Sequence, residues 1–69
     1  MTGVVRRYDA MLCWGFIRGD DGESYFLHSS EIRGAHPGVG DRVEFDATLT
    51  EKGLRAVGVR RLDTGTGGL

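Results

Sequence analysis

Residues 13–32, CWGFIRGDDGESYFLHSSEI, carry side chains that could hold a flat ligand. Trp14 and Phe16 stand two residues apart, and so do Phe26 and His28. Aromatic side chains on the face of a sheet can stack on nucleobases, with a contribution of about 1–3 kcal/mol per base. The same rings could instead fill a hydrophobic core, so the direction in which they point decides what they do.

The spacing predicts two adjacent antiparallel strands. Residues 13–19 alternate with the period of a strand, with Trp14 and Phe16 on one face and Ile17 on the other. Residues 19–22 form an acidic, glycine-containing turn, and residues 23–28 return with Phe26 and His28 on one face. Burying a histidine without partners is costly, so we expect the rings to share the exposed face, where cross-strand neighbours touch. The predicted core residues are Ile17, Leu27, Val43 and Phe45.

The opposite assignment, with the rings in the core, stays open on the pattern alone. Trp14 and Phe16 offer more apolar surface than Ile17 and the glycines beside it, so packing by itself would favour them as core residues. If the rings are exposed, a binding role follows, because monomeric proteins rarely expose a contiguous apolar patch without a use.

The rest of the chain predicts three further strands and little helix. Residues 3–9, 42–50 and 54–62 are rich in β-branched residues or alternate. A short helical turn capped by a serine is expected at residues 29–32, and residues 33–41 form a loop. Five short strands in so small a chain favour an all-β protein, a small closed or nearly closed five-stranded antiparallel barrel.

Length and composition indicate one small domain. The chain has 69 residues with 12 glycines, which argues against a helical bundle. One cysteine excludes an intrachain disulfide, and there is no membrane-spanning run or hydrophobic leader, so we expect a cytoplasmic protein without membrane contact. Residues 63–69 are expected to form a flexible tail. The formal net charge of −1 argues against a generic, strongly basic nucleic-acid binder.

No arrangement of catalytic or metal-binding residues is recognisable. His28 and His36, without a cysteine pair, do not make a zinc pattern. The acidic residues of turn 20–23 suit a solvated hairpin better than a calcium loop, and Cys13 is interpreted as an unreactive thiol. We therefore predict that the protein is not an enzyme and uses no cofactor, metal or small-molecule substrate.

Five segments, taken together, resemble the motifs of the bacterial cold-shock proteins, which consist of a single cold-shock domain. The family's first ribonucleoprotein-type motif, K-G-F-G-F-I, corresponds to Leu12–Ile17, and its second, V-F-V-H-F, corresponds to Tyr25–Ser29. The other three segments are Thr2–Asp9, Gly40–Phe45 and Lys52–Val59. The similarity extends over nearly the whole chain.

This resemblance implies an OB-type barrel over residues 1–62 that binds single-stranded RNA or DNA on one aromatic face. It also implies a role as an RNA chaperone or as a regulator of transcription or translation. Tyr8 is expected to hold an aromatic position beside the other rings. The residues that match binding positions of the family are Arg6, Arg7, Tyr8, Trp14, Phe16, Phe26, His28, Lys52 and Arg55.

The chain departs from the family pattern at several positions. Arg7 replaces a tryptophan, Ser29 replaces an aromatic residue, and Leu12 and Cys13 replace a lysine and a glycine. The loss of two stacking rings predicts binding that is weaker and sensitive to salt. Arg7 restores part of the affinity, because a guanidinium can stack on a base and attract phosphate.

The loop at residues 33–39 is shorter than in the family. Only His36 could replace the stacking aromatic that this loop usually carries. Short, strained connections favour the exchange of strands between two copies of a chain. A strand-swapped dimer is therefore the alternative to a monomer, and light scattering distinguishes the two.

A second functional hypothesis is a protein-interaction module on the same barrel. The lost rings, the apolar pair Leu12 and Cys13 and the slightly negative charge would then mark a surface that contacts a protein. Binding of bases predicts a steep dependence on salt and sensitivity to replacement of Phe16 or Phe26. Binding of a protein predicts sensitivity at Leu12 and Trp14 with little effect of salt.

Overall fold

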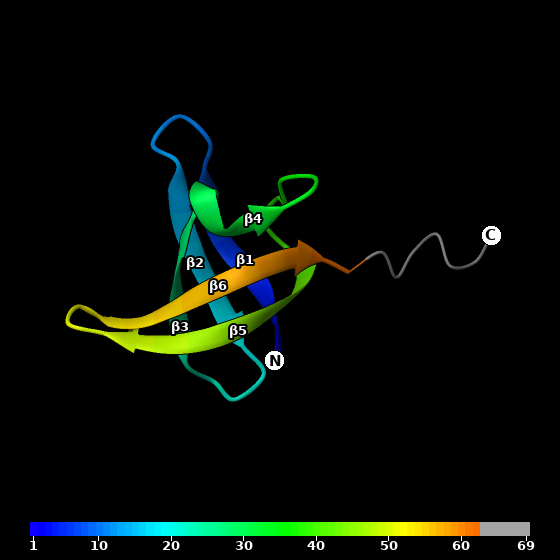
Figure 1. Cartoon of the computed structure of the whole chain (residues 1–69). Coiled ribbons are helices and arrows are strands. Elements are labelled where there is room, and N and C mark those ends of the chain that lie inside the picture. The colour runs from blue at the N-terminus through cyan, green and yellow to red at the C-terminus, as the bar shows by residue number, and fades with distance from the viewer. Residues whose placement is uncertain (63–69) are drawn as a thin grey trace.

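The computed structural model describes residues 1–62 and contains five long strands around one core (Figure 1). A 3-10 turn, η1 (Ser29–Glu31), and a two-residue strand, β4 (Ile32–Arg33), follow the third long strand. The predicted flexible tail, residues 63–69, lies outside the described residues. The long strands are β1 (Thr2–Asp9), β2 (Trp14–Gly19), β3 (Ser24–His28), β5 (Arg42–Thr50) and β6 (Gly53–Arg61).

The first three strands form an antiparallel meander whose alternation decides which side chains enter the core. Ile17 in β2 and Leu27 in β3 are buried. Their neighbours in the chain, Phe16 beside Ile17 and Phe26 and His28 beside Leu27, are more exposed. In β1 the register shifts between Val5 and Arg7, so Arg6 is the extra residue of a β-bulge. The bulge lets Val5 face the core and Arg7 face outward.

Strand β6 closes the barrel because it pairs on both sides. It runs antiparallel to β5 along most of its length and parallel to β3, where Arg55 meets Phe26. Its last part also pairs in parallel with β4, at Ile32 and Val59. The sheet order β3-β2-β1-β5-β6-β4, with the additional β3–β6 pairing, is that of a closed five-stranded barrel. The predicted barrel is confirmed, although its closing seam is parallel.

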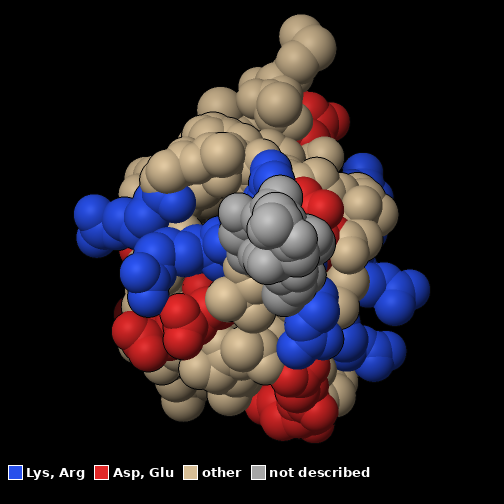
Figure 2. Space-filling model, turned by 90° about the vertical axis from the view of Figure 1, so that its right-hand side faces the viewer, with Lys and Arg blue, Asp and Glu red and all other residues tan. Residues whose placement is uncertain are grey.

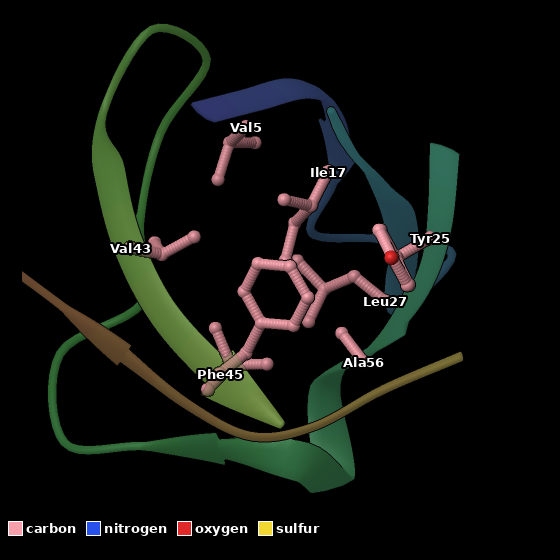
Figure 3. Packing of buried hydrophobic residues seen from close by; sticks show 8 residues of the cluster. Val5, Ile17, Tyr25, Leu27, Val43, Phe45 and Ala56 are labelled. Atoms are coloured by element: carbon pink, nitrogen blue, oxygen red, sulfur yellow. The ribbon is translucent and has the colours of Figure 1, made fainter. Parts of the chain in front are cut away.

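The core fills the inside of the barrel and contains all four residues that the sequence predicts for it. Ile17, Leu27 and Val43 are fully buried and Phe45 is 2% exposed. The ring of Tyr25 joins them, with its centroid 5.1 Å from that of Phe45 (Figure 3). The inside of the barrel is thus filled without Trp14 or Phe16. Of the two assignments that the sequence pattern left open, the structure has the one with the rings outside the core. The remaining core residues are Val5, Ala56 and Val59.

Three local expectations differ from the structure. The cap of η1 is His28 instead of a serine, because the imidazole Nδ1 accepts the backbone N–H of Ser30 at 3.1 Å. Cys13 lies in the turn before β2 and not in the strand, with a φ of 65°, a region that favours glycine. Strand β4 falls in the predicted turn and loop, since a two-residue strand has no periodicity to detect.

Candidate nucleic-acid interface

The strand register places two phenyl rings between two arginines in one row across the sheet. Arg7 in β1 pairs with Phe16 in β2, Phe16 pairs with Phe26 in β3, and Phe26 pairs with Arg55 in β6. We call these four residues the central row. The row joins residues 48 positions apart, Arg7 and Arg55, and it exists only because β6 closes the barrel against β3.

The next row adds the two remaining rings. Trp14 pairs with His28, and the Trp14 and Phe26 rings stack with centroids 6.2 Å apart and planes inclined by 22°. Phe16 meets Trp14 edge-on at 5.6 Å. Phe16 is 39% exposed, and the other three rings are half-buried. The predicted placement on one outer face is thus confirmed, and we call Trp14, Phe16, Phe26 and His28 the aromatic face.

Gly15 allows this face to form. It lies between Trp14 and Phe16 and points inward, where a Cβ atom would lie 2.0 Å from the carbonyl oxygen of Arg7. Strands β1 and β2 could not approach so closely around any larger residue. The glycine therefore brings Arg7 of β1 close to the rings of β2.

His28 is fixed in orientation by the turn that follows it. Its Nδ1 accepts the backbone N–H of Ser30 and lies 2.9 Å from the Ser30 hydroxyl oxygen. Because Nδ1 acts as an acceptor, the neutral ring carries its proton on Nε2, which leaves Nε2 as a donor. The ring thus adds a hydrogen-bond donor to the aromatic face.

Both arginines of the central row lie against rings of the aromatic face. The Arg7 Cζ is 5.5 Å from the centroid of the Trp14 ring, and the Arg55 Cζ is 6.0 Å from that of Phe26. These are cation–π distances. Guanidinium groups beside rings can contact phosphate or stack on a base, so the aromatic face has a cation on either side.

The structure places the other predicted site residues in different surroundings. Lys52 lies in the exposed turn between β5 and β6, and Arg6 is exposed at the β1 bulge. Tyr8 does not join the aromatic face: it pairs with Gly15, packs against the core, and its hydroxyl lies 3.0 Å from His36 Nδ1. The bulge at Arg6 fixes this placement, since it sends Arg7 outward and Tyr8 inward.

A groove of about 450 Å³ lies beside the aromatic face. Four of its lining residues are predicted as site residues from the sequence. Ser24, Thr50 and Leu54 are not, because they come together only where the hairpin of β5 and β6 leans toward β3. Arg18 is not predicted either, although alternation with Trp14 and Phe16 places Arg18 on the same face of β2. The groove is lined by Phe16, Ser24, Phe26, Thr50, Lys52, Leu54 and Arg55.

Asp9, which lies beside the aromatic face, is engaged by the backbone of its own turn, and Glu31 pairs with Arg55 at 3.9 Å. Asp9 stands opposite Trp14, but its Oδ1 accepts the backbone N–H groups of Met11 and Leu12 at 3.0 and 3.1 Å. On the side of the molecule at the right of Figure 1, basic and acidic side chains are interspersed (Figure 2). Three ion pairs of 3.3, 3.0 and 3.9 Å link β5 and β6 to each other and to neighbouring turns: Arg42–Asp20, Arg60–Glu44 and Arg61–Asp41.

The turn between β2 and β3 holds a tyrosine and an aspartate in a tight hydrogen bond. The Tyr25 hydroxyl donates to Asp21, which raises the pKa of Tyr25 to about 12, and burial adds to the shift. The same bond lowers the pKa of Asp21. A hydrogen bond donated by Thr2 lowers the pKa of Asp20. These acidic groups stabilise the hairpin that presents the aromatic face.

Neither a metal cluster nor a membrane helix is found in the described part of the chain. Residues 1–62 contain no group of three or more His, Cys, Asp or Glu side chains that could hold a metal ion. No helix among them has the length and apolar character needed to cross a bilayer.

A closed all-β barrel with an aromatic face bordered by cations has the architecture of OB-type nucleic-acid-binding domains. Comparison with known families agrees: residues 1–62 match the family model of the 'Cold-shock' DNA-binding domain. The chain belongs to this family, whose domains bind nucleic acids. A solved structure, Drosophila Unr CSD456, shares the fold with a TM-score of 0.74 and 22% identity. That similarity covers 94% of this chain and only 27% of the other chain.

Proposed function

We propose that this protein binds single-stranded RNA or DNA by stacking bases on the aromatic face. The observation that supports this most directly is the central row, because it sets two rings side by side with an arginine at each end. The rings supply stacking, at about 1–3 kcal/mol per base. Arg7 and Lys52 contact phosphates, and Arg55 borders the rings from β6. Arg6 borders the interface from the bulge of β1, whereas Tyr8 packs against the core and is left out of the proposed interface.

Binding of this kind would act on RNA structure without catalysis. A base stacked on Phe16 or Phe26 cannot pair, so the protein would disfavour hairpins and act as an RNA chaperone or a regulator of transcripts. Arg7 stands where the family has a stacking tryptophan, and Ser29 supplies no ring. We therefore expect affinity below that of a domain with all its rings and a marked dependence on salt.

The first test is Trp14 fluorescence during titration with a pyrimidine-rich single-stranded heptamer. Trp14 is the only tryptophan and lies on the aromatic face, so it reports on stacking directly. We expect quenching at low salt that high salt reverses, because phosphate contacts release counterions. A flat titration at low salt, with strand in large excess, would contradict the proposal.

One observation favours a second candidate, a protein-interaction surface. Met11 is 92% exposed and Leu12 is 58% exposed in the turn that leads to Trp14. An apolar turn of this kind would suit a protein partner better than a phosphate backbone. If this candidate is correct, the original protein does not bind the heptamer. Leu12→Ser then weakens binding to the protein partner equally at low and at high salt.

A further inference from the structure

The groove beside the aromatic face has the size and shape to hold one base. Its volume of about 450 Å³ lies within the usual range of small-molecule sites. The rings of Phe16 and Phe26 and the side chain of Leu54 supply apolar walls. The polar lining residues are Thr50 of β5, Lys52 in the turn that follows, Arg55 of β6 and Ser24 of β3. A flat ligand stacked on either ring would present its polar edge to the far wall.

That far wall consists almost entirely of hydrogen-bond donors. Lys52 and Arg55 are donors only. The hydroxyl of Thr50 donates its proton to the carbonyl oxygen of Gly53 at 2.8 Å and accepts the backbone N–H of Lys52 at 3.2 Å. No carboxylate lines the groove among the described residues. An edge made of acceptors therefore suits this lining better than an edge that carries an amino group, for which the side chains offer only the hydroxyl oxygens of Ser24 and Thr50 as acceptors.

Arg55 is held in place but keeps donors to spare. Its Cζ lies 6.0 Å from the Phe26 ring centroid, and its Nη2 lies 3.9 Å from Glu31 Oε2. The other oxygen of Glu31 accepts the backbone N–H of Gly58 at 3.2 Å, which fixes the carboxylate. Within residues 1–62, the buried Nε of Arg55 has no hydrogen-bond partner. The guanidinium is thus oriented without being satisfied.

We propose that the groove takes a guanine base and that Arg55 determines this specificity. Guanine presents O6 and N7 as adjacent acceptors, and the planar fork of arginine matches them with two hydrogen bonds. Uracil and thymine offer one carbonyl oxygen at a time to such a fork, and adenine places an amino donor beside N7. Unpaired cytosine also presents two adjacent acceptors, O2 and N3, but its single ring covers less of Phe16 and Phe26 than a purine does. A phosphate also fits the fork, but it gains nothing from the two phenyl rings. The inference deepens the proposed function and rests on it.

The test compares heptamers in which one uridine of a U7 strand is replaced by guanosine, adenosine or 7-deazaguanosine, at each position in turn. Affinity is measured by Trp14 fluorescence. At one position we expect guanosine to bind about tenfold more tightly than adenosine, within the range for a bidentate arginine–guanine pair. The 7-deaza analogue lacks the N7 acceptor but keeps its ring system, so it should lose most of this advantage.

Variants at Arg55 identify the residue responsible. Arg55→Lys keeps the charge and removes the fork, and Arg55→Gln removes both. Each should abolish the guanosine preference, which is measured within each variant as the ratio of affinities for the guanosine and adenosine strands. Binding to U7 should fall in both variants as well, because Arg55 belongs to the interface. Arg60→Lys is the matched control, because Arg60 is an exposed arginine on the same strand that pairs with Glu44 at 3.0 Å. It should leave the preference unchanged, and circular dichroism checks that every variant is folded.

The outcomes separate this inference from the function on which it rests. If U7 binds and guanosine gives no advantage at any position, the guanine site is wrong and the proposed function stands. A preference that survives in folded Arg55→Lys and Arg55→Gln proteins, or with 7-deazaguanosine, also refutes it. If no heptamer binds, both fail.

Discussion

Replacing Phe16 by leucine separates the binding role of the aromatic face from its structural role. Phe16 is 39% exposed, so part of its surface is available to a base. Loss of one stacking partner should cost about 1–3 kcal/mol in binding, which is roughly a 5- to 150-fold fall in affinity. Leucine keeps most of the apolar contact, and only the edge-on contacts of Phe16 with Trp14 and Phe26 are lost. At about 0.5–1.5 kcal/mol for each of the two aromatic pairs, the free energy of unfolding should fall by about 1–3 kcal/mol.

The matched control is Phe45→Leu, which makes the same chemical change inside the barrel. Phe45 is 2% exposed and packs against Tyr25, so this variant should lose stability and keep its affinity where it is folded. The assay combines urea unfolding with Trp14 fluorescence titration of a pyrimidine-rich heptamer at low salt and low temperature. If Phe16→Leu binds within twofold of the original protein, the stacking role of Phe16 is refuted. Equal loss of affinity in both variants would point to a general effect of stability instead.

Three further predictions concern stability, pH and salt. Cys13→Gly should raise Tm by a few degrees in calorimetry. The φ of 65° costs a residue with a Cβ about 1–2 kcal/mol, and the flexibility of glycine in the unfolded chain offsets only about 0.5–1 kcal/mol of this gain. An unchanged or lower Tm contradicts the prediction. The neutral form of Tyr25 is stabilised by its bond to Asp21, so its contribution is complete below the ordinary pKa of 10.0 and is lost as pH rises toward the folded value of about 12. Tyr25→Phe should therefore flatten the alkaline fall in stability, and an unaltered profile would show that Tyr25 is not its source. Arg18→Gln should lower the slope of log affinity against log salt by about 0.7 with stability nearly unchanged, whereas an identical slope would remove Arg18 from the interface.

The effect of Arg7 on binding depends on its place in the central row. Arg7 pairs with Phe16 across the sheet, and its guanidinium lies against Trp14. The resemblance to the family aligns Arg7 with a tryptophan. A cation therefore stands where the resemblance implies a ring, and Trp14, Phe16 and Phe26 contact one another beside it. This exchange is the physical basis for expecting weaker stacking together with a larger share of salt-dependent affinity.

Much of the fold could be predicted from local patterns. Alternation fixed the faces of β2 and β3, and the cost of burying His28 identified Ile17 and Leu27 as core residues. The placement of the aromatic face on the outside followed from the same argument. Such predictions succeed because a strand has a strict period of two, so one confident assignment determines every other side chain on that strand.

Other features depend on contacts between distant segments or on local geometry that alternation does not encode. The bulge at Arg6 sends Tyr8 to the inner side of β1, and the side chain of His28 caps η1 in place of a serine. A period of two cannot reveal a bulge before the partner strand is known, and the cap depends on how the imidazole folds back over the turn.

The sequence by itself determined that the chain is all-β, identified four residues of its core, Ile17, Leu27, Val43 and Phe45, and favoured an exposed position for the rings. The tertiary structure alone decided that Phe26 meets Arg55, that the two arginines of the central row lie on opposite sides of the rings, and that a groove opens beside them. The physical reason is barrel closure. The pairing of β6 with β3 joins segments that no local pattern relates, and it creates the groove and the orientation of Arg55 at the same time.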